Sequence, residues 1–197
     1  MVLAVEADAA RRRARALLRD LPLAVTTTGG AHRLGGTARG LAPYDHVDVT
    51  RPDGGTLRIT ALPALHGPPG AAAVNGDVIG FLLAGDGLPS VYVSGDNASV
   101  DVVREIAGRA GSVDVAVLFA GAAGAPQLFD GAPLTLTGAA AAEAASLLGA
   151  RAVVPIHCEG WTHYSEDTAA LVAAFAAAGL EDVLRVVPAG EAAELGY

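Results

Sequence analysis

Three side chains that can bind a metal ion each stand directly after a run of apolar residues: His66, Asp96 and His157. The Gly-Pro-Pro-Gly segment 67–70 cannot continue a sheet, so we expect the His66 imidazole at the tip of a strand. Two imidazoles and a carboxylate suit zinc, manganese or iron. Each residue also has a structural interpretation, because a strand-end histidine is often hydrogen-bonded within the fold and a strand-end aspartate often caps a helix. The residue types therefore predict a metal site or an acid–base site.

The loop after His157 carries further candidates. We expect Trp161, His163 and Tyr164 to shape a substrate pocket. Cys158 is the only cysteine of the chain. A thiolate would be a strong zinc ligand, but a cysteine at the end of a strand is more often a small buried hydrophobic residue. The two remaining histidines, His32 and His46, are isolated and are expected on the surface.

The elements that must position these residues begin with helical and hairpin signals. Apolar residues at helical spacing predict an amphipathic helix over 7–20 and, after a strand at 23–27, glycine pairs bracket a turn or short helix. Two hairpins follow, because turn residues at 52–55 and 85–87 separate apolar runs. Their predicted strands are 45–50, 56–64, 78–83 and 91–95.

From residue 91 onward, strands alternate with helices. The predicted helices are 99–110, 138–148 and 166–178, the last with Ser165 as its N-cap. The predicted strands are 114–120, 152–156 and a closing strand at 183–187. Antiparallel hairpins followed by this alternation predict a mixed α/β fold.

The composition sets limits on the whole chain. With 197 residues, 52% of them hydrophobic, residues 1–197 are expected to form a single domain. A formal charge of −8 and a pI near 4.9 argue against nucleic acid as a partner. No apolar stretch reaches the roughly 18 residues that a membrane span needs, and no export signal is recognisable. A lone cysteine fits a reducing compartment, so we expect a cytoplasmic protein.

Four segments, in this order along the chain, resemble the second half of the metallo-β-lactamase superfamily, in the branch similar to ascorbate-6-phosphate lactonase. They are Ala-Leu-His-Gly-Pro at 64–68, Val-Tyr-Val-Ser-Gly-Asp-Asn at 91–97, Asp-Val-Ala-Val-Leu-Phe at 114–119, and Val-Pro-Ile-His at 154–157 with Glu-Gly-Trp at 159–161. The resemblance spans roughly residues 20–190. It implies a four-layer αββα sandwich with one or two metal ions, where a metal-bound water attacks an ester, lactone, amide or phosphoester.

On the matching positions, the resemblance implies a role for each residue. His66 would be a ligand of the first metal, Asp96 the catalytic carboxylate that bridges both metals, and His157 a ligand of the second. The family's H-x-H-x-D-H segment, which precedes the helix expected at 7–20 and supplies most of the ligands, is absent from the chain. The sandwich is therefore expected to be incomplete at the N-terminus.

Three ligands cannot fill two tetrahedral zinc sites. The sequence thus predicts a metal-dependent hydrolase-like domain with an incomplete site, which binds one zinc or manganese ion or none and is weak or inactive as it stands. Its substrate, if it is active, would be a small molecule.

Two other interpretations remain open. One is a non-catalytic module that pairs with a second copy or a partner, because 23–27 and 56–64 are expected to be weakly charged strands near an uncovered sheet edge. A homo-oligomer, most simply a dimer, follows from that expectation. The other is a doubly wound nucleotide-binding fold that uses the segment 94–97, although the glycine fingerprint of such folds is absent.

Overall fold

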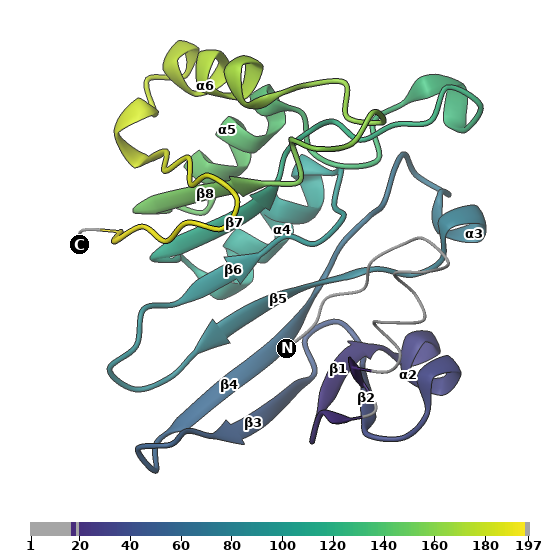
Figure 1. Cartoon of the computed structure of the whole chain (residues 1–197), viewed down its shortest axis with the longest axis vertical. Coiled ribbons are helices and arrows are strands. Elements are labelled where there is room, and N and C mark those ends of the chain that lie inside the picture. The colour runs from purple at the N-terminus through teal and green to yellow at the C-terminus, as the bar shows by residue number, and fades with distance from the viewer. Residues whose placement is uncertain (1–16, 19, 196–197) are drawn as a thin grey trace.

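A computed structural model describes residues 17–18 and 20–195 (Figure 1). Its main element is a six-stranded sheet with the strand order β3-β4-β5-β6-β7-β8. The strands are β3 (His46–Thr50), β4 (Thr56–Pro63), β5 (Ile79–Ala84), β6 (Val91–Val93), β7 (Val115–Phe119) and β8 (Ala152–Ile156). Neighbours from β3 to β6 are antiparallel, as the two hairpins predict, and β6, β7 and β8 are parallel.

Helices connect the parallel strands, because parallel neighbours need a crossover connection. α4 (Val100–Ala110) connects β6 to β7 and α5 (Gly138–Leu147) connects β7 to β8, whereas α6 (Thr168–Ala177) follows β8. The N-cap of α6 is Asp167, whose carboxylate accepts the Ala170 N–H at 2.9 Å. The prediction of Ser165 as the cap is wrong, because its hydroxyl donates instead to the Ala122 carbonyl at 2.8 Å.

The core between this sheet and the three helices follows from strand periodicity. Alternate residues of a strand face opposite sides of a sheet, and on β4 Leu62 faces the helices while Ala61 faces away. The fully buried side chains of Tyr92 on β6 and Phe175 on α6 belong to the same helical-side core. Burial of these apolar surfaces is the main force that fixes the helices on this face.

A second, small sheet covers the opposite face. It consists of the parallel strands β1 (Ala24–Thr27) and β2 (Ala38–Leu41), which α2 (Thr28–Leu34) connects. Val25 and Leu41 of this sheet pack with Phe81 of β5, and α2 lies beside β1 and β2 (Figure 1). The layers are thus helices, large sheet, small sheet and helix, which confirms the predicted αββα arrangement.

Short elements complete the described chain: α3 (Ala72–Asn75), and the 3-10 turns η1 (Phe129–Gly131) and η2 (Glu181–Val183). The strand predicted at 183–187 is wrong. The Leu184 N–H is used within the η2 turn by the Glu181 carbonyl at 3.2 Å, and the segment forms only one bridge, between Leu184 and Val153 of β8.

Two other expectations concern the helix predicted at 7–20 and the sheet edge predicted at 56–64. The helix predicted at 7–20 lies outside the described residues, apart from Leu17, Leu18 and Asp20, which are helical. The segment 56–64 is not at a sheet edge, because β4 pairs with both β3 and β5.

Among the described residues, no helix has both the length and the apolar character that a membrane crossing requires.

Candidate metal centre

The parallel strands bring two of the predicted site residues together. Asp96 follows β6 and His157 follows β8, and β6, β7 and β8 end at the same edge of the sheet because they run in the same direction. The Asp96 Oδ1 and His157 Nε2 atoms lie 3.9 Å apart. This distance is too long for a hydrogen bond, but it shows that the two side chains lie close together.

One polar atom of each side chain is buried without a hydrogen-bond partner among the described residues: Asp96 Oδ1 and His157 Nδ1. Burial of an unpaired polar atom is costly, and native folds seldom tolerate it without a ligand, ion or water. A carboxylate oxygen and an imidazole nitrogen are both metal ligands. These two atoms therefore fit roles in a metal centre.

The backbone at His157 is unusual for a residue with a side chain. Its φ is 61°, in the left-handed region that non-glycine residues rarely adopt. The segment after β7 packs closely against it, since a Cβ atom placed on Gly121 would lie 2.2 Å from the His157 carbonyl oxygen. Only glycine allows this approach. Gly121 thus helps to position His157, a role that we did not predict from the sequence.

His66 lies three residues after the end of β4 and is half-buried. Its Nδ1 is 2.9 Å from the Leu134 carbonyl oxygen, a distance that fits an Nδ1–H donor. In that tautomer Nε2 keeps its lone pair. A histidine that donates one ring N–H to a carbonyl and presents the other nitrogen is the usual arrangement of a metal ligand.

Asn97 connects the loop of His66 to the loop of Asp96. Its side chain is fully buried, its Oδ1 accepts the Leu65 N–H at 3.0 Å, and its Nδ2 donates to the Ser99 carbonyl at 2.9 Å. These bonds hold the residues just before His66 and just after Asp96 at a fixed separation. The sequence showed Asn97 only as a polar residue before a helix, so its bridging role was missed.

The electrostatic surroundings keep the His157 ring neutral. Burial lowers the pKa of His157 and is the largest cause, the Asp96 carboxylate acts in the opposite direction, and His163 and His66 lower the pKa further. A neutral imidazole keeps a lone pair for a metal. The contribution from His66 also shows that this residue lies within electrostatic range of His157.

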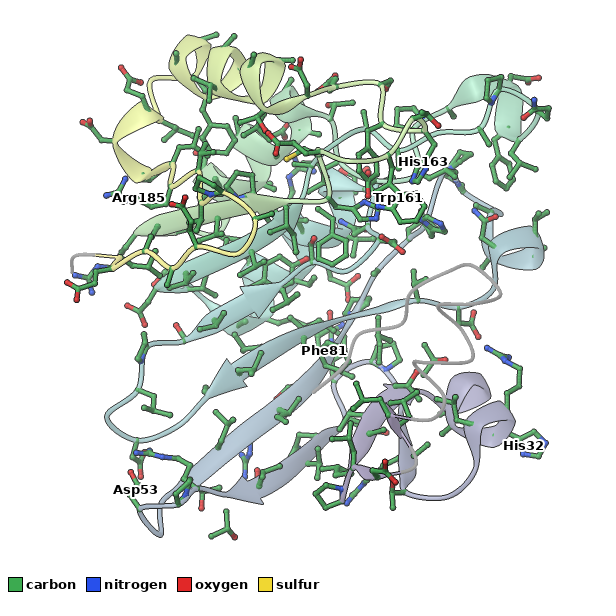
Figure 2. All side chains as sticks on the ribbon, viewed as in Figure 1. His32, Asp53, Phe81, Trp161, His163 and Arg185 are labelled. Atoms are coloured by element: carbon green, nitrogen blue, oxygen red, sulfur yellow. The ribbon has the colours of Figure 1, made fainter. Side chains whose placement is uncertain are left out.

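The three residues predicted for the substrate pocket make ring contacts at this site. The His157 ring centroid is 4.6 Å from that of Tyr164, which is 4.5 Å from that of His163, and His163 is 5.7 Å from Trp161. Trp161 and His163 lie together in the loop after β8 (Figure 2). Burial raises the pKa of Tyr164, and the Asp96 charge raises it further.

The remaining candidates are two exposed histidines and a buried cysteine. His32 on α2 and His46 on β3 are exposed, and His32 is far from His163 (Figure 2). Cys158 is buried, with its sulfur 3.7 Å from the Thr168 hydroxyl. Burial raises the pKa of the Cys158 thiol, which disfavours the thiolate form that zinc would need.

Asp96 and His157 lie close together, and His66 is oriented by Leu134 and acts on His157 electrostatically. The unpaired atoms of Asp96 and His157 fit ligand roles. Within residues 17–18 and 20–195, no group of three or more His, Cys, Asp or Glu side chains is arranged to hold a metal ion.

Two sheets lie between helical layers, and polar residues stand at the carboxyl ends of the parallel strands of the large sheet. The family model of the β-lactamase superfamily domain matches residues 11–158. The chain therefore belongs to the β-lactamase superfamily, in its metallo-β-lactamase fold. The doubly wound alternative is wrong, since three of the five strand pairings in the large sheet are antiparallel. No curated protein sequence matches the chain.

Solved structures agree on the fold. An isothiocyanate hydrolase from Delia radicum gut bacteria is 20% identical, with a TM-score of 0.66 over 84% of this chain and 64% of its own. A protein described as a possible metal-dependent hydrolase, from Veillonella parvula, is 14% identical, with a TM-score of 0.69 over 87% and 66%. A metallo hydrolase from the archaeon Ignicoccus hospitalis is 22% identical, with a TM-score of 0.61 over 85% and 66%. The chain thus spans less than two thirds of the length of each.

Proposed function

We propose that this chain is a metal-dependent hydrolase-like domain in which His66, Asp96 and His157 are the metal ligands. The observation that carries the proposal is the pair of buried, unpartnered atoms, Asp96 Oδ1 and His157 Nδ1. The hydrogen bond of His66 to the Leu134 carbonyl supports the third ligand. Nitrogen and carboxylate ligands suit zinc or manganese.

When bound in such a site, the metal supplies a nucleophilic water at neutral pH and polarises the carbonyl or phosphoryl group that is attacked. The chain's own residues orient the ligands and limit access of water. Asn97 holds the His66 and Asp96 loops together. Gly121 has no Cβ and so leaves room for the His157 carbonyl oxygen. Asp96 is the proposed catalytic carboxylate.

We further propose that the metal site is incomplete in the chain as it stands, so that hydrolysis is weak or absent. A catalytic zinc usually has three protein ligands and a water, and no such group is assembled within the part of the chain that the structure describes. One weakly held ion is the expected occupancy. The substrate would be a small molecule. The buried lone Cys158 supports a reducing, cytoplasmic setting.

The test is metal content after loading with zinc or manganese and dialysis, measured by mass spectrometry for the wild type and for His157→Ala. We expect His157→Ala to lose most of the bound metal, because the proposed site has three protein ligands and the variant would keep only two of them. The matched control is His46→Ala, an exposed histidine on β3, which should bind as the wild type does. Equal metal content in both variants would contradict the assignment of His157.

The second candidate function is a non-catalytic module with the same fold. It is favoured by the lack of a three-ligand group among the described residues. In that case the wild type, His157→Ala and His46→Ala should all retain no more metal than an unrelated control protein.

A further inference from the structure

We propose that the site binds an uncharged substrate that carries a planar aromatic group, and that Trp161 is the residue that selects it. The proposal rests on the function proposed above, because it places the reacting group of the substrate beside Asp96 and His157. It adds the chemical class of the substrate and the residue that recognises it.

The first observation is a row of rings that leads from the metal centre to the surface. We call the side chains of Phe119, His157, Tyr164, His163 and Trp161 the ring row. The Phe119 and His157 rings are stacked, with centroids 5.1 Å apart and planes 28° apart. From His157 the row continues through Tyr164 and His163 to Trp161. A molecule whose reactive end lies at His157 therefore has ring surfaces along its length.

The second observation is that aromatic residues are scarce elsewhere. The chain has one Trp, four Tyr and four Phe, yet three of these nine and two of its five histidines form the ring row. Trp161 is 55% exposed at the outer end of the row. An exposed indole beside a candidate site offers its ring surface to a ligand. Planar groups stack or pack edge-to-face on such rings more favourably than saturated groups of equal size do.

The third observation concerns charge. The loops that end at this edge of the sheet, residues 64–71, 94–99, 120–137 and 157–167, contain no arginine and no lysine. They contain several carboxylates, among them Asp96, Asp130 and Glu159. A substrate carboxylate or phosphate would thus find no cationic side chain in these loops, so only the metal ion could balance its charge. This favours an uncharged substrate over a phosphorylated one.

A cationic substrate is the nearest competitor, because ring faces also attract cations. The ring geometry argues against it. Apart from the stacked Phe119–His157 pair, the contacts of the ring row are tilted or edge-on, as in the 50° angle between the Trp161 and His163 planes. Rings that contact one another in this way do not present the several converging faces of a cation cage. A cation would also need a nearby carboxylate. Glu159, the glutamate nearest in sequence to Trp161, already accepts a hydrogen bond from the Thr168 hydroxyl.

Because Trp161 is the only tryptophan, its fluorescence reports directly on occupancy of the outer end. We would titrate the full chain, without added metal, with four probes of similar size: phenylacetamide, cyclohexylacetamide, phenylacetate and phenyltrimethylammonium. We expect phenylacetamide to change the emission and to bind roughly tenfold more tightly than each of the other three. Equal affinity for the cyclohexyl probe, or preference for either charged probe, would overturn the proposal.

Variants separate a specific role of Trp161 from general damage to the loop. Measured by calorimetry, Trp161→Leu should lose the preference for phenylacetamide over cyclohexylacetamide, and Trp161→Phe should restore most of it. The control is Val172→Ala, which removes another exposed apolar side chain, on α6, and should bind as the wild type does. A preference that survives in Trp161→Leu would refute the role of Trp161.

The binding assay and the metal assay test the two proposals separately. If the wild type binds phenylacetamide selectively but retains no metal, the aromatic subsite stands and the hydrolase proposal fails. If the wild type retains metal at His157 but shows no aryl preference, the hydrolase proposal stands and the substrate class is wrong.

Discussion

At the scale of single residues, the candidate site depends on a backbone conformation as much as on its side chains. His157 turns into the left-handed region directly after β8, at a cost of about 1 kcal/mol. The loop of Gly121 packs closely against that turn, because a Cβ atom on Gly121 would lie 2.2 Å from the His157 carbonyl oxygen. A glycine in the loop after another strand thus helps to position the imidazole.

Gly121→Ala is therefore expected to destabilise the fold by about 1 to 3 kcal/mol, and to reduce metal retention as well. The added Cβ would lie 2.2 Å from the His157 carbonyl oxygen and 2.8 Å from the Cys158 Cα, so the backbone of the His157 loop must shift. Chemical denaturation measures the first effect and metal content the second.

Gly124→Ala is the matched control, because its Cβ would meet only the Ala122 carbonyl oxygen, at 3.8 Å. Its unfolding midpoint and metal content should stay near those of the wild type. A Gly121→Ala protein that behaves like this control would show that the His157 loop adapts without strain.

At the scale of elements, the parallel strands are joined by polar contacts at the edge opposite the site. Asp114, just before β7, accepts the Ser90 N–H at 2.8 Å and the Ser90 hydroxyl at 2.9 Å, and Arg151 before β8 contacts it at 3.3 Å. One carboxylate thus links the starts of β6, β7 and β8. This helps to set the register that brings Asp96 and His157 together at the other end.

Acid should weaken this link. The hydrogen bonds from the Ser90 backbone and side chain, and then the Arg151 guanidinium, hold the pKa of Asp114 below its ordinary value. A carboxylate with a lowered pKa in the folded state stabilises the fold above its unfolded pKa of roughly 3.9, and this contribution is lost as the pH falls through the folded pKa.

We therefore expect Asp114→Asn to show a smaller loss of stability than the wild type between about pH 5 and pH 3, since it lacks the group that titrates. Urea unfolding at several pH values gives the slope. Asp77→Asn, an exposed change in the loop before β5, should alter the slope less. An unchanged slope in Asp114→Asn would assign the acid sensitivity to other carboxylates.

At the scale of the whole molecule, the two cores share one sheet. Leu62 and Leu82 lie with the helical-side core, whereas Ile59 and Phe81 of the same strands lie with the core under the small sheet. Because β4 and β5 contribute to both cores, we propose that residues 1–197 behave as a single domain. Loss of either core should then weaken the other.

Phe81→Ala tests this. Phe81 is 2% exposed, so its truncation should cost about 3 to 5 kcal/mol and lower the unfolding temperature of the whole molecule in one step. Far-ultraviolet and near-ultraviolet circular dichroism should give the same midpoint. Two separate transitions would mean that the small sheet and α2 unfold independently of the larger unit.

We still predict self-association, but through other sheet edges than the segment 56–64. The segment 56–64 cannot be an open edge, because it is paired on both sides as β4. Among the described strands, β3 and β8 end the large sheet, and the Leu184 bridge partly covers β8. That leaves β3 and the small sheet as the available edges. Sedimentation at low micromolar concentration should show a dimer, and a monomer would contradict the edge argument.

The sequence by itself determined most of the elements and their order, although β2 and α3 were not predicted. Period-two and helical patterns, with turn residues between them, predicted the two hairpins, the alternation after residue 91 and the segments that end in His66, Asp96 and His157. These features are local, because side-chain periodicity and turn conformation depend on residues a few positions apart. The resemblance of a few short segments then predicted the family, which the family model confirms.

Only the tertiary structure decided how the parts meet. It paired Asp96 with His157 across β7, left one buried atom of each without a partner, and made Asn97 and Gly121 the residues that position the ligands. It also turned the predicted closing strand at 183–187 into a 3-10 turn and a single bridge. These outcomes depend on contacts between residues far apart in the chain, which compete with local preference and which no local pattern records.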